Sequence, residues 1–215
     1  MMQRYISRRD FIAKLSAISM VPLVPSNINA SISENAYIAA LATVMTEQAE
    51  LNNAFFSDGA KDNLIYAYRK IKPRNHQETA FVVACGSQVL PVRYLVDDYV
   101  RRRSGSPTAL PDHHLLLLQG WGLPESHRIL IFREQLISLL EELTGQSGEH
   151  VNRLFSGLLR NTMAISAAVL NEKYRNELTQ WDISMLNKAF LCYAPFSRPY
   201  AWCSTMAERA EKLLA

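Results

Sequence analysis

The sequence predicts an all-α fold: a compact helical domain with an extended aromatic and proline-rich C-terminal tail. After residue 30, apolar residues recur at three- and four-residue steps, which is the spacing of one face of a helix. No stretch alternates apolar and polar residues for long enough to form a sheet, and no internal repeat is present. The chain has 215 residues, 48% hydrophobic and 20% charged, which suits one folded domain. We assign that domain to residues 31–215.

The first predicted helix opens at Ser33-Glu34-Asn35, whose polar residues favour a helix start. Its apolar face consists of Tyr37, Ile38, Leu41, Val44 and Met45. We expect Ser57-Asp58-Gly59 to break this helix. A second, shorter helix follows and ends near Lys72-Pro73, with an apolar side made of Leu64, Ile65 and Tyr68.

The next segment, residues 77–103, is apolar early and charged late, and Gly86 and Pro91 are its expected bends. Ser104-Gly105-Ser106-Pro107 is predicted to be a loop. Pro124-Glu125 then suits the opening of a helix, because proline fits the first turn and glutamate favours the positive end of the helix dipole. The stripe of this helix is Ile129, Phe132, Leu136, Leu139, Leu140 and Leu143, and Gly145 is placed to end it.

A further helix is expected from about Glu149 into the 170s. After Ala194 the composition changes, and prolines alternate with large aromatic side chains. We expect this tail to be extended; it contains Pro195, Phe196, Pro199, Tyr200 and Trp202. A short helix from about Met206 to Leu214 is predicted to follow it.

Residues 1–30 have the layout of an export leader, with a positive region, an apolar stretch over 12–24 and the small-residue exit Ile28-Asn29-Ala30. The run S-R-R-D-F-I-A-K resembles the twin-arginine signal, with its lysine one place late. The signal residues are Ser7, Arg8, Arg9, Phe11 and Ile12. We therefore expect a periplasmic protein, exported as a folded chain that acquires a cofactor or a partner in the cytoplasm. The alternative is an amphipathic first helix of the domain.

The formal charge of +3 lies entirely in this leader, which has four basic residues and one acidic residue. The remaining 19 basic and 19 acidic residues balance. This balance argues against a nucleic-acid-binding protein, which needs a basic face on its folded domain. No later apolar stretch reaches the roughly 20 residues of a membrane-spanning helix, so we expect none in the mature chain.

Motifs for a dinucleotide, a nucleoside triphosphate, an iron–sulfur cluster, covalent haem or a zinc protease site are absent from the sequence. We therefore predict no catalytic, cofactor or metal residues in this chain. Asp112-His113-His114 is the only histidine cluster, but adjacent helical histidines diverge by about 100° and favour a solvated helix start over a metal site. Arg101-Arg102-Arg103 suits either the negative end of a helix dipole or a contact with phosphate or lipid headgroups. Glu141-Glu142 is expected to solvate its helix. His76, His127 and His150 are isolated and expected at the surface.

The three cysteines allow one internal bridge, and an oxidising compartment would permit Cys192 to pair with Cys203. Cys85 lies in an apolar run and is expected to be a small buried side chain. It could instead pair with another chain, since an odd thiol remains in an exported protein. The aromatic tail is a candidate partner interface, and the alternative is that it covers the helices of its own chain.

The leader, the cofactor-free helical body and the tail together resemble the small subunit of membrane-bound FAD-dependent sugar and polyol dehydrogenases, including the sorbitol, fructose and glucose dehydrogenases. The matching tail is residues 193–202, Y-A-P-F-S-R-P-Y-A-W, and residues 37–46 are similar to the opening helix of that family. This resemblance implies a large FAD-bearing partner subunit and often a membrane cytochrome c subunit. It implies interface residues among Tyr193, Pro199, Tyr200 and Trp202.

The expected function is therefore that of a non-catalytic accessory subunit, which stabilises the catalytic subunit and carries it through export. FAD would belong to the partner, and none is expected in this chain. Two alternatives remain: a stand-alone periplasmic helical protein that binds a small ligand, and an exported enzyme whose site the sequence does not reveal.

Overall fold

The computed structural model describes residues 33–105, 129–144, 147–149 and 196–215, and all regular secondary structure among them is helical. This result confirms the all-α prediction. The helices are α2 (Glu34–Leu51), α3 (Asp58–Ile71), α4 (His76–Gly86), α5 (Arg93–Arg103), α7 (Arg133–Thr144) and α11 (Tyr200–Leu213). The leader (1–30), the Asp112-His113-His114 cluster and the helix predicted from Glu149 lie outside the described residues, apart from the start of that helix.

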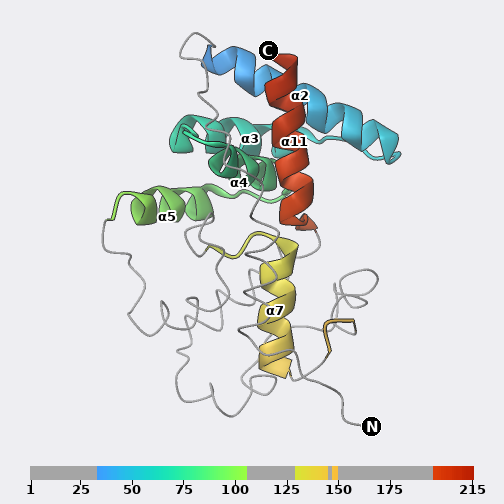
Figure 1. Cartoon of the computed structure of the whole chain (residues 1–215), viewed down its shortest axis with the longest axis vertical. Coiled ribbons are helices and arrows are strands. Elements are labelled where there is room, and N and C mark those ends of the chain that lie inside the picture. The colour runs from blue at the N-terminus through green and yellow to red at the C-terminus, as the bar shows by residue number, and fades with distance from the viewer. Residues whose placement is uncertain (1–32, 106–128, 145–146, 150–195) are drawn as a thin grey trace.

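Helices α3 and α4 pack together, and α3 also contacts α5 and α2. Helix α11, from the other end of the chain, packs against both α4 and α2. Figure 1 shows α11 crossing these earlier helices, with α7 continuing beyond its N-terminal end. The last helix thus completes a core that the first four described helices begin.

Three of these helices begin at a polar side chain that caps the first turn. Ser33 accepts a hydrogen bond from the N–H of Ala36, and Ser57 accepts one from Ala60, each at 3.2 Å. Asn75 accepts one from Glu78 at 2.9 Å. Such caps satisfy amide groups that have no partner within the helix. Ser57-Asp58-Gly59 therefore forms the start of α3. The preceding helix, α2, ends at Leu51, so the predicted break lies before these residues.

The core is apolar and contains a chain of aromatic contacts from four segments. The Phe81 ring stacks on Tyr99 with 4.1 Å between centroids and meets Phe132 edge-on at 6.4 Å. Phe132 in turn meets Tyr200 edge-on at 5.2 Å. These contacts join α4, α5, α11 and the segment that precedes α7. Aromatic pairs of this kind stabilise a fold beyond what the burial of their apolar area contributes.

Asn63 in α3 fixes the connection between α4 and α5. Its side-chain amide donates to the carbonyls of Gln88 and Leu90, both at 2.9 Å, and its oxygen accepts from the N–H of Val92 at 3.3 Å. Asn63 is buried, and its bonds to Gln88 and Val92 pair buried backbone groups. The predicted bends at Gly86 and Pro91 are confirmed, because α4 ends at Gly86 and α5 begins at Arg93.

The start predicted for the helix of the Ile129–Leu143 stripe is wrong. Residues 129–132 are not helical, and α7 begins only at Arg133. The side chain of Gln135 accepts hydrogen bonds from the N–H groups of Ile131 and Phe132, at 3.0 and 2.9 Å, which holds this segment outside the helix. The end of α7 at Thr144, directly before Gly145, is as predicted.

The extended tail is shorter than we predicted. Ser197, Arg198 and Pro199 have no regular structure, but α11 begins at Tyr200 and not near Met206. Pro199 directly precedes the first helical residue, where its missing N–H and its fixed φ do not oppose a helix. Pro199 therefore ends the non-helical segment and does not prevent Tyr200 and Trp202 from being helical.

Candidate functional site

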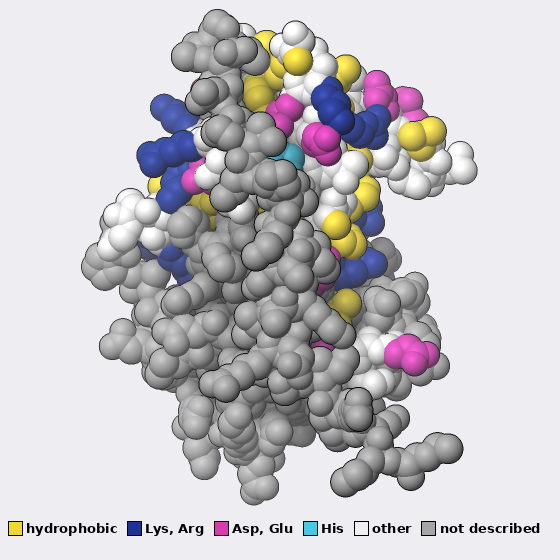
Figure 2. Space-filling model, viewed as in Figure 1, with side chains coloured by type: hydrophobic (Ala, Val, Ile, Leu, Met, Phe, Trp, Pro, Cys, Tyr) yellow, Lys and Arg dark blue, Asp and Glu magenta, His cyan; other side chains and the backbone are white. Residues whose placement is uncertain are grey.

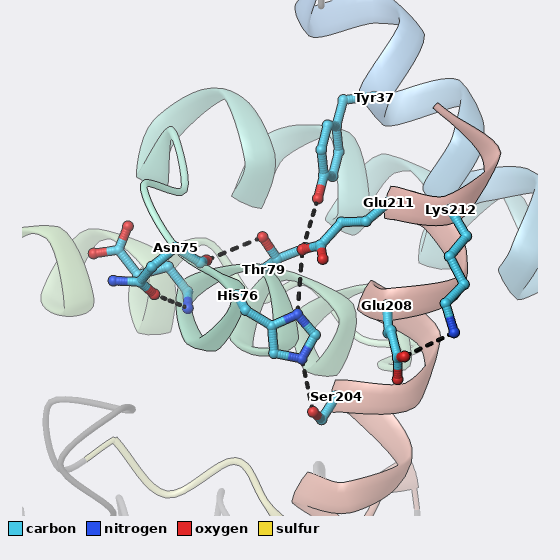
Figure 3. Close-up of polar contacts among 9 residues, drawn as sticks. Tyr37, Asn75, His76, Thr79, Ser204, Glu208, Glu211 and Lys212 are labelled. Carbon is cyan, nitrogen blue, oxygen red and sulfur yellow. Dashed lines mark hydrogen bonds and ion pairs between the residues drawn. The ribbon is translucent and has the colours of Figure 1, made fainter. Parts of the chain in front are cut away.

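A polar cluster joins α2, α4 and α11, and His76 is at its centre. His76 is the first residue of α4, and its two ring nitrogens contact two residues of α11 (Figure 3). Nε2 lies 2.8 Å from the Ser204 hydroxyl, and Nδ1 lies 3.2 Å from Oε1 of Glu211. Ser204 and Glu211 are seven residues apart, about two helical turns, so both lie on the face of α11 that meets α4.

Tyr37 adds the third helix to this cluster. Its hydroxyl donates to the same Glu211 oxygen at 3.1 Å, and its ring is buried and stacks on Tyr68. One carboxylate therefore receives hydrogen bonds from α2 and α4 while it lies on α11. Outside the cluster, Arg209 adds an ion pair to Glu47 at 2.9 Å, which also joins α11 to α2.

The charges of the cluster favour a protonated imidazole. The hydrogen bond to Glu211 raises the pKa of His76; burial opposes this, and the negative charges of Glu211 and Glu208 reinforce it. Burial and the nearby Glu211 charge raise the pKa of Tyr37 well above its usual range, so that its phenol remains a donor. At the exposed edge of the cluster, Lys212 pairs with Glu208 at 2.8 Å.

In chemical terms, Ser204, His76 and Glu211 form a hydroxyl–imidazole–carboxylate chain, the order of groups found in acyl-transfer enzymes. Ser204 lies inside α11, where backbone N–H groups bond to carbonyls four residues earlier. Donors for an oxyanion would therefore have to come from another segment. Among the described residues, no group of three potential metal ligands is present.

The start of α11 is held by α7. Both carboxylate oxygens of Glu134 lie 3.1 Å from the N–H of Tyr200, and the N–H of Arg133 donates to the Arg198 carbonyl at 3.1 Å. Burial raises the pKa of Glu134, while its backbone hydrogen bonds partly offset that effect. A carboxylate at this position also complements the positive end of the α11 dipole.

The predicted interface residues are only partly described. Pro199 precedes α11, Tyr200 packs on Phe132, and Trp202 is half-buried against the core with the Arg198 guanidinium 5.6 Å from its ring centroid. Tyr193 lies outside the described residues, as do the signal residues Ser7, Arg8, Arg9, Phe11 and Ile12. Tyr200 and Trp202 thus contact this chain's own helices, and their role toward a partner stays a prediction.

The two described cysteines, Cys85 and Cys203, are free and buried. Cys85 is a small core side chain, as predicted, and burial raises the pKa of both thiols. Cys192 lies outside the described residues, so its pairing with Cys203 stays a prediction.

The arginine triplet at the end of α5 is largely engaged by carboxylates. Arg102 pairs with Asp98 at 2.7 Å, and Arg103 pairs with Glu78 at 3.1 Å. Arg101 reaches Asp98 only at 3.9 Å and is exposed. Of the two interpretations of the triplet, the one based on the helix dipole accounts for Arg102 and Arg103, which lie in the last turn of α5. Glu141 is half-buried on α7, and burial raises its pKa.

His76 was expected to be an isolated surface residue, and that expectation is wrong. Its partners follow 128 and 135 residues later in the chain, and neither forms a local motif with it. The sequence holds one indication that these residues face the core. Tyr37 lies on the apolar face of α2, and Ser204 and Glu211 are next to the buried residues Cys203 and Ala210 of α11.

No model of a known protein family matches the chain, and no curated protein is significantly similar to it. Among the described residues, no helix combines the length and apolar character needed to cross a bilayer.

Proposed function

We propose that the chain is a non-catalytic accessory subunit of a periplasmic FAD-dependent sugar or polyol dehydrogenase. It would stabilise the catalytic subunit and carry it through twin-arginine export, with FAD held by that partner. In the family that the chain resembles, a membrane cytochrome c subunit often belongs to the assembly as well. The leader at residues 7–12 and the tail sequence at 193–202 support this proposal.

One structural observation supports the proposal most directly. Helix α2 contains residues 37–46, one of the two segments similar to the dehydrogenase small subunits, and α11 begins within the other. These helices pack together, and Tyr37 bonds to Glu211 between them. From the second segment, Tyr200 and Trp202 pack against the core cluster that contains Tyr37 and Leu41 of the first.

The test is purification of the tagged chain from the periplasm, with identification of co-purifying proteins and measurement of flavin absorbance. We expect a large FAD-bearing protein that has no leader of its own. In the variant Arg8→Lys/Arg9→Lys, both proteins should remain in the cytoplasm, because the export route reads the arginine pair and not charge alone. Export of the double variant at the normal level, or a periplasmic chain without any flavoprotein, would contradict the proposal.

The tail can be tested separately. Trp202→Ala should weaken capture of the flavoprotein and cost only about 1–2 kcal/mol of folding stability, because the ring is half-buried. Phe55→Ala is the matched control, since Phe55 is an aromatic residue with 80% of its surface exposed. A loss of about 3–5 kcal/mol in Trp202→Ala with capture intact would assign Trp202 to the core of this chain alone.

Hydrolysis of an activated acyl ester is a second candidate, favoured by the chain of hydrogen bonds from Ser204 through His76 to Glu211. It ranks below the accessory role because Ser204 lies inside a helix. Labelling by a fluorophosphonate probe that is lost in both Ser204→Ala and His76→Gln would support this activity. Absence of labelling in the wild-type chain would exclude it.

A further inference from the structure

The ends of α3 and α5 form one exposed basic edge, defined by Lys70, Lys72, Arg74 and Arg101. Helices α3 and α5 run in the same direction. Asn63 contacts the backbone near the start of α5, and one turn later the Tyr66 hydroxyl bonds to Asp97 at 3.0 Å. Both helices therefore end on the same side of the domain (Figure 1).

A single carboxylate ties the loop after α3 to the end of α5. Oε2 of Glu78 accepts the backbone N–H of Arg74 at 2.7 Å and the guanidinium of Arg103 at 3.1 Å. Lys72 and Arg74 are exposed, while Pro73 between them is buried. The two cationic side chains therefore project outward beside the α5 terminus. Figure 2 shows dark blue side chains gathered along this side of the described surface.

The charge at this edge is not neutralised locally. Arg69, Arg102 and Arg103 have carboxylate partners in Glu34, Asp98 and Glu78. Within the described part of the chain, Lys70, Lys72 and Arg74 form no ion pair, and Arg101 is 3.9 Å from a carboxylate already engaged by Arg102. The mature chain is neutral as a whole, so this edge is a local excess of positive charge.

Helix stability does not account for the whole edge. Basic residues in a last turn complement the helix dipole, which explains Lys70 and Arg101. Lys72 and Arg74 lie beyond the last helical residue, Ile71. Lys72 also has a φ of 49°, in the left-handed region where glycine is favoured and other residues are strained. A lysine at this position adds charge at a cost in backbone energy.

We infer that the basic edge binds the anionic headgroups of a phospholipid membrane. Clusters of four or more exposed Lys and Arg side chains bind anionic lipid surfaces. The attraction comes from the negative surface potential of the lipids, so it requires no shaped pocket. The choice of a membrane rests on the proposed export, which brings the folded chain to a bilayer. The local excess of positive charge at the basic edge does not depend on that proposal.

The test is binding of the full-length chain to two kinds of vesicle: phosphatidylcholine alone, and phosphatidylcholine with about 30% phosphatidylglycerol, an anionic lipid content that attracts basic clusters. Arg4, Arg8, Arg9 and Lys14 are replaced by Gln in every sample, so that the leader's charge does not contribute. Sedimentation gives the partition coefficient. We expect binding to the anionic vesicles only, and we expect it to fall as added salt shortens the screening length.

The decisive comparison is between two triple variants that remove the same charge. Lys70→Gln/Lys72→Gln/Arg74→Gln should lower the partition coefficient at least about tenfold, since each cation near the surface contributes about fivefold. Lys61→Gln/Arg93→Gln/Lys212→Gln, on other exposed parts of the domain, should lower it by less than about threefold. Circular dichroism of each variant verifies that the fold is retained, and the single variant Arg74→Gln should weaken binding about fivefold.

Equal losses in the two triple variants, or no binding to anionic vesicles at low salt, would overturn the inference. Binding of a short RNA that depends on the basic edge, without binding to vesicles, would overturn it in favour of a nucleic-acid surface. None of these measurements depends on export or on a flavoprotein, so this inference and the proposed function can fail separately.

Discussion

His76 and Glu211 form an ion pair across the contact of α4 with α11, with 3.2 Å between Nδ1 and Oε1. The pair holds the first turn of one helix to the last turn of another, and the Tyr37 hydroxyl shares the same carboxylate oxygen. Because the pair joins segments that are 135 residues apart, its strength should be visible in the stability of the whole fold and not of one helix.

This pair makes stability depend on pH. The pKa of His76 is raised in the folded state, so its contribution is fully present below the unfolded value of about 6.5 and is lost as pH rises through the folded pKa. We expect Glu211→Gln to cost about 0.5–1 kcal/mol more at pH 5.5 than at pH 8.5. Urea unfolding at both pH values measures this difference. Ser204→Ala, which retains the pair, is the control; equal losses of Glu211→Gln at both pH values would contradict the assignment.

Asn63→Asp should destabilise the fold by about 2–4 kcal/mol. The substitution removes both N–H donors and places a carboxylate against the carbonyls of Gln88 and Leu90 in a buried site. Asn52→Asp is the matched control, because Asn52 is exposed and donates to a single carbonyl, that of Gln48. Thermal unfolding followed by circular dichroism compares the two; similar losses would show that the Asn63 side chain does not hold the α4–α5 connection.

Gly86→Ala should also destabilise the protein, by about 1–3 kcal/mol. A Cβ atom there would lie 2.8 Å from Cδ1 and 3.0 Å from Cβ of Leu64, so α3 and α4 would have to separate. In Gly59→Ala the nearest atom would be the Val89 carbonyl oxygen at 3.3 Å, a milder contact. Chemical denaturation should therefore rank Gly86→Ala well below Gly59→Ala in stability; the reverse order would contradict the close packing at Gly86.

Gln88→Met should stabilise the protein by about 1 kcal/mol. The Gln88 side chain is fully buried, and neither its oxygen nor its nitrogen has a hydrogen-bond partner within the described structure. Methionine has a similar length and no polar group to desolvate. The midpoint of urea unfolding measures the change, with Gln48→Met as the control: Gln48 is half-buried, and its side-chain oxygen accepts a hydrogen bond from Arg209 at 3.2 Å, so this variant should not gain stability. A loss of stability in Gln88→Met would mean that the amide has a partner, such as an internal water molecule.

Features set by neighbouring residues could be predicted from the sequence. Ser33 starts α2, Gly86 and Pro91 separate α4 from α5, and Thr144 ends α7, because caps, glycine and proline act on the backbone within one turn. The start of α7 could not be predicted, since it depends on which backbone groups the Gln135 side chain accepts from. Of the candidate site, only the position of Tyr37 on the apolar face of its helix could be predicted. The site exists only because α11 returns to α4, and no local pattern records that contact.

The return of α11 also has a consequence for the timing of folding during synthesis. Buried residues of α11, such as Met206 and Ala210, complete the core formed by α2 and α4. A ribosome adds about 5–20 residues per second, so α11 follows α2 by roughly ten to thirty seconds. Throughout that interval the apolar faces of the earlier helices lack their cover and are accessible to chaperones. The nascent chain must therefore wait for α11 before this core can close.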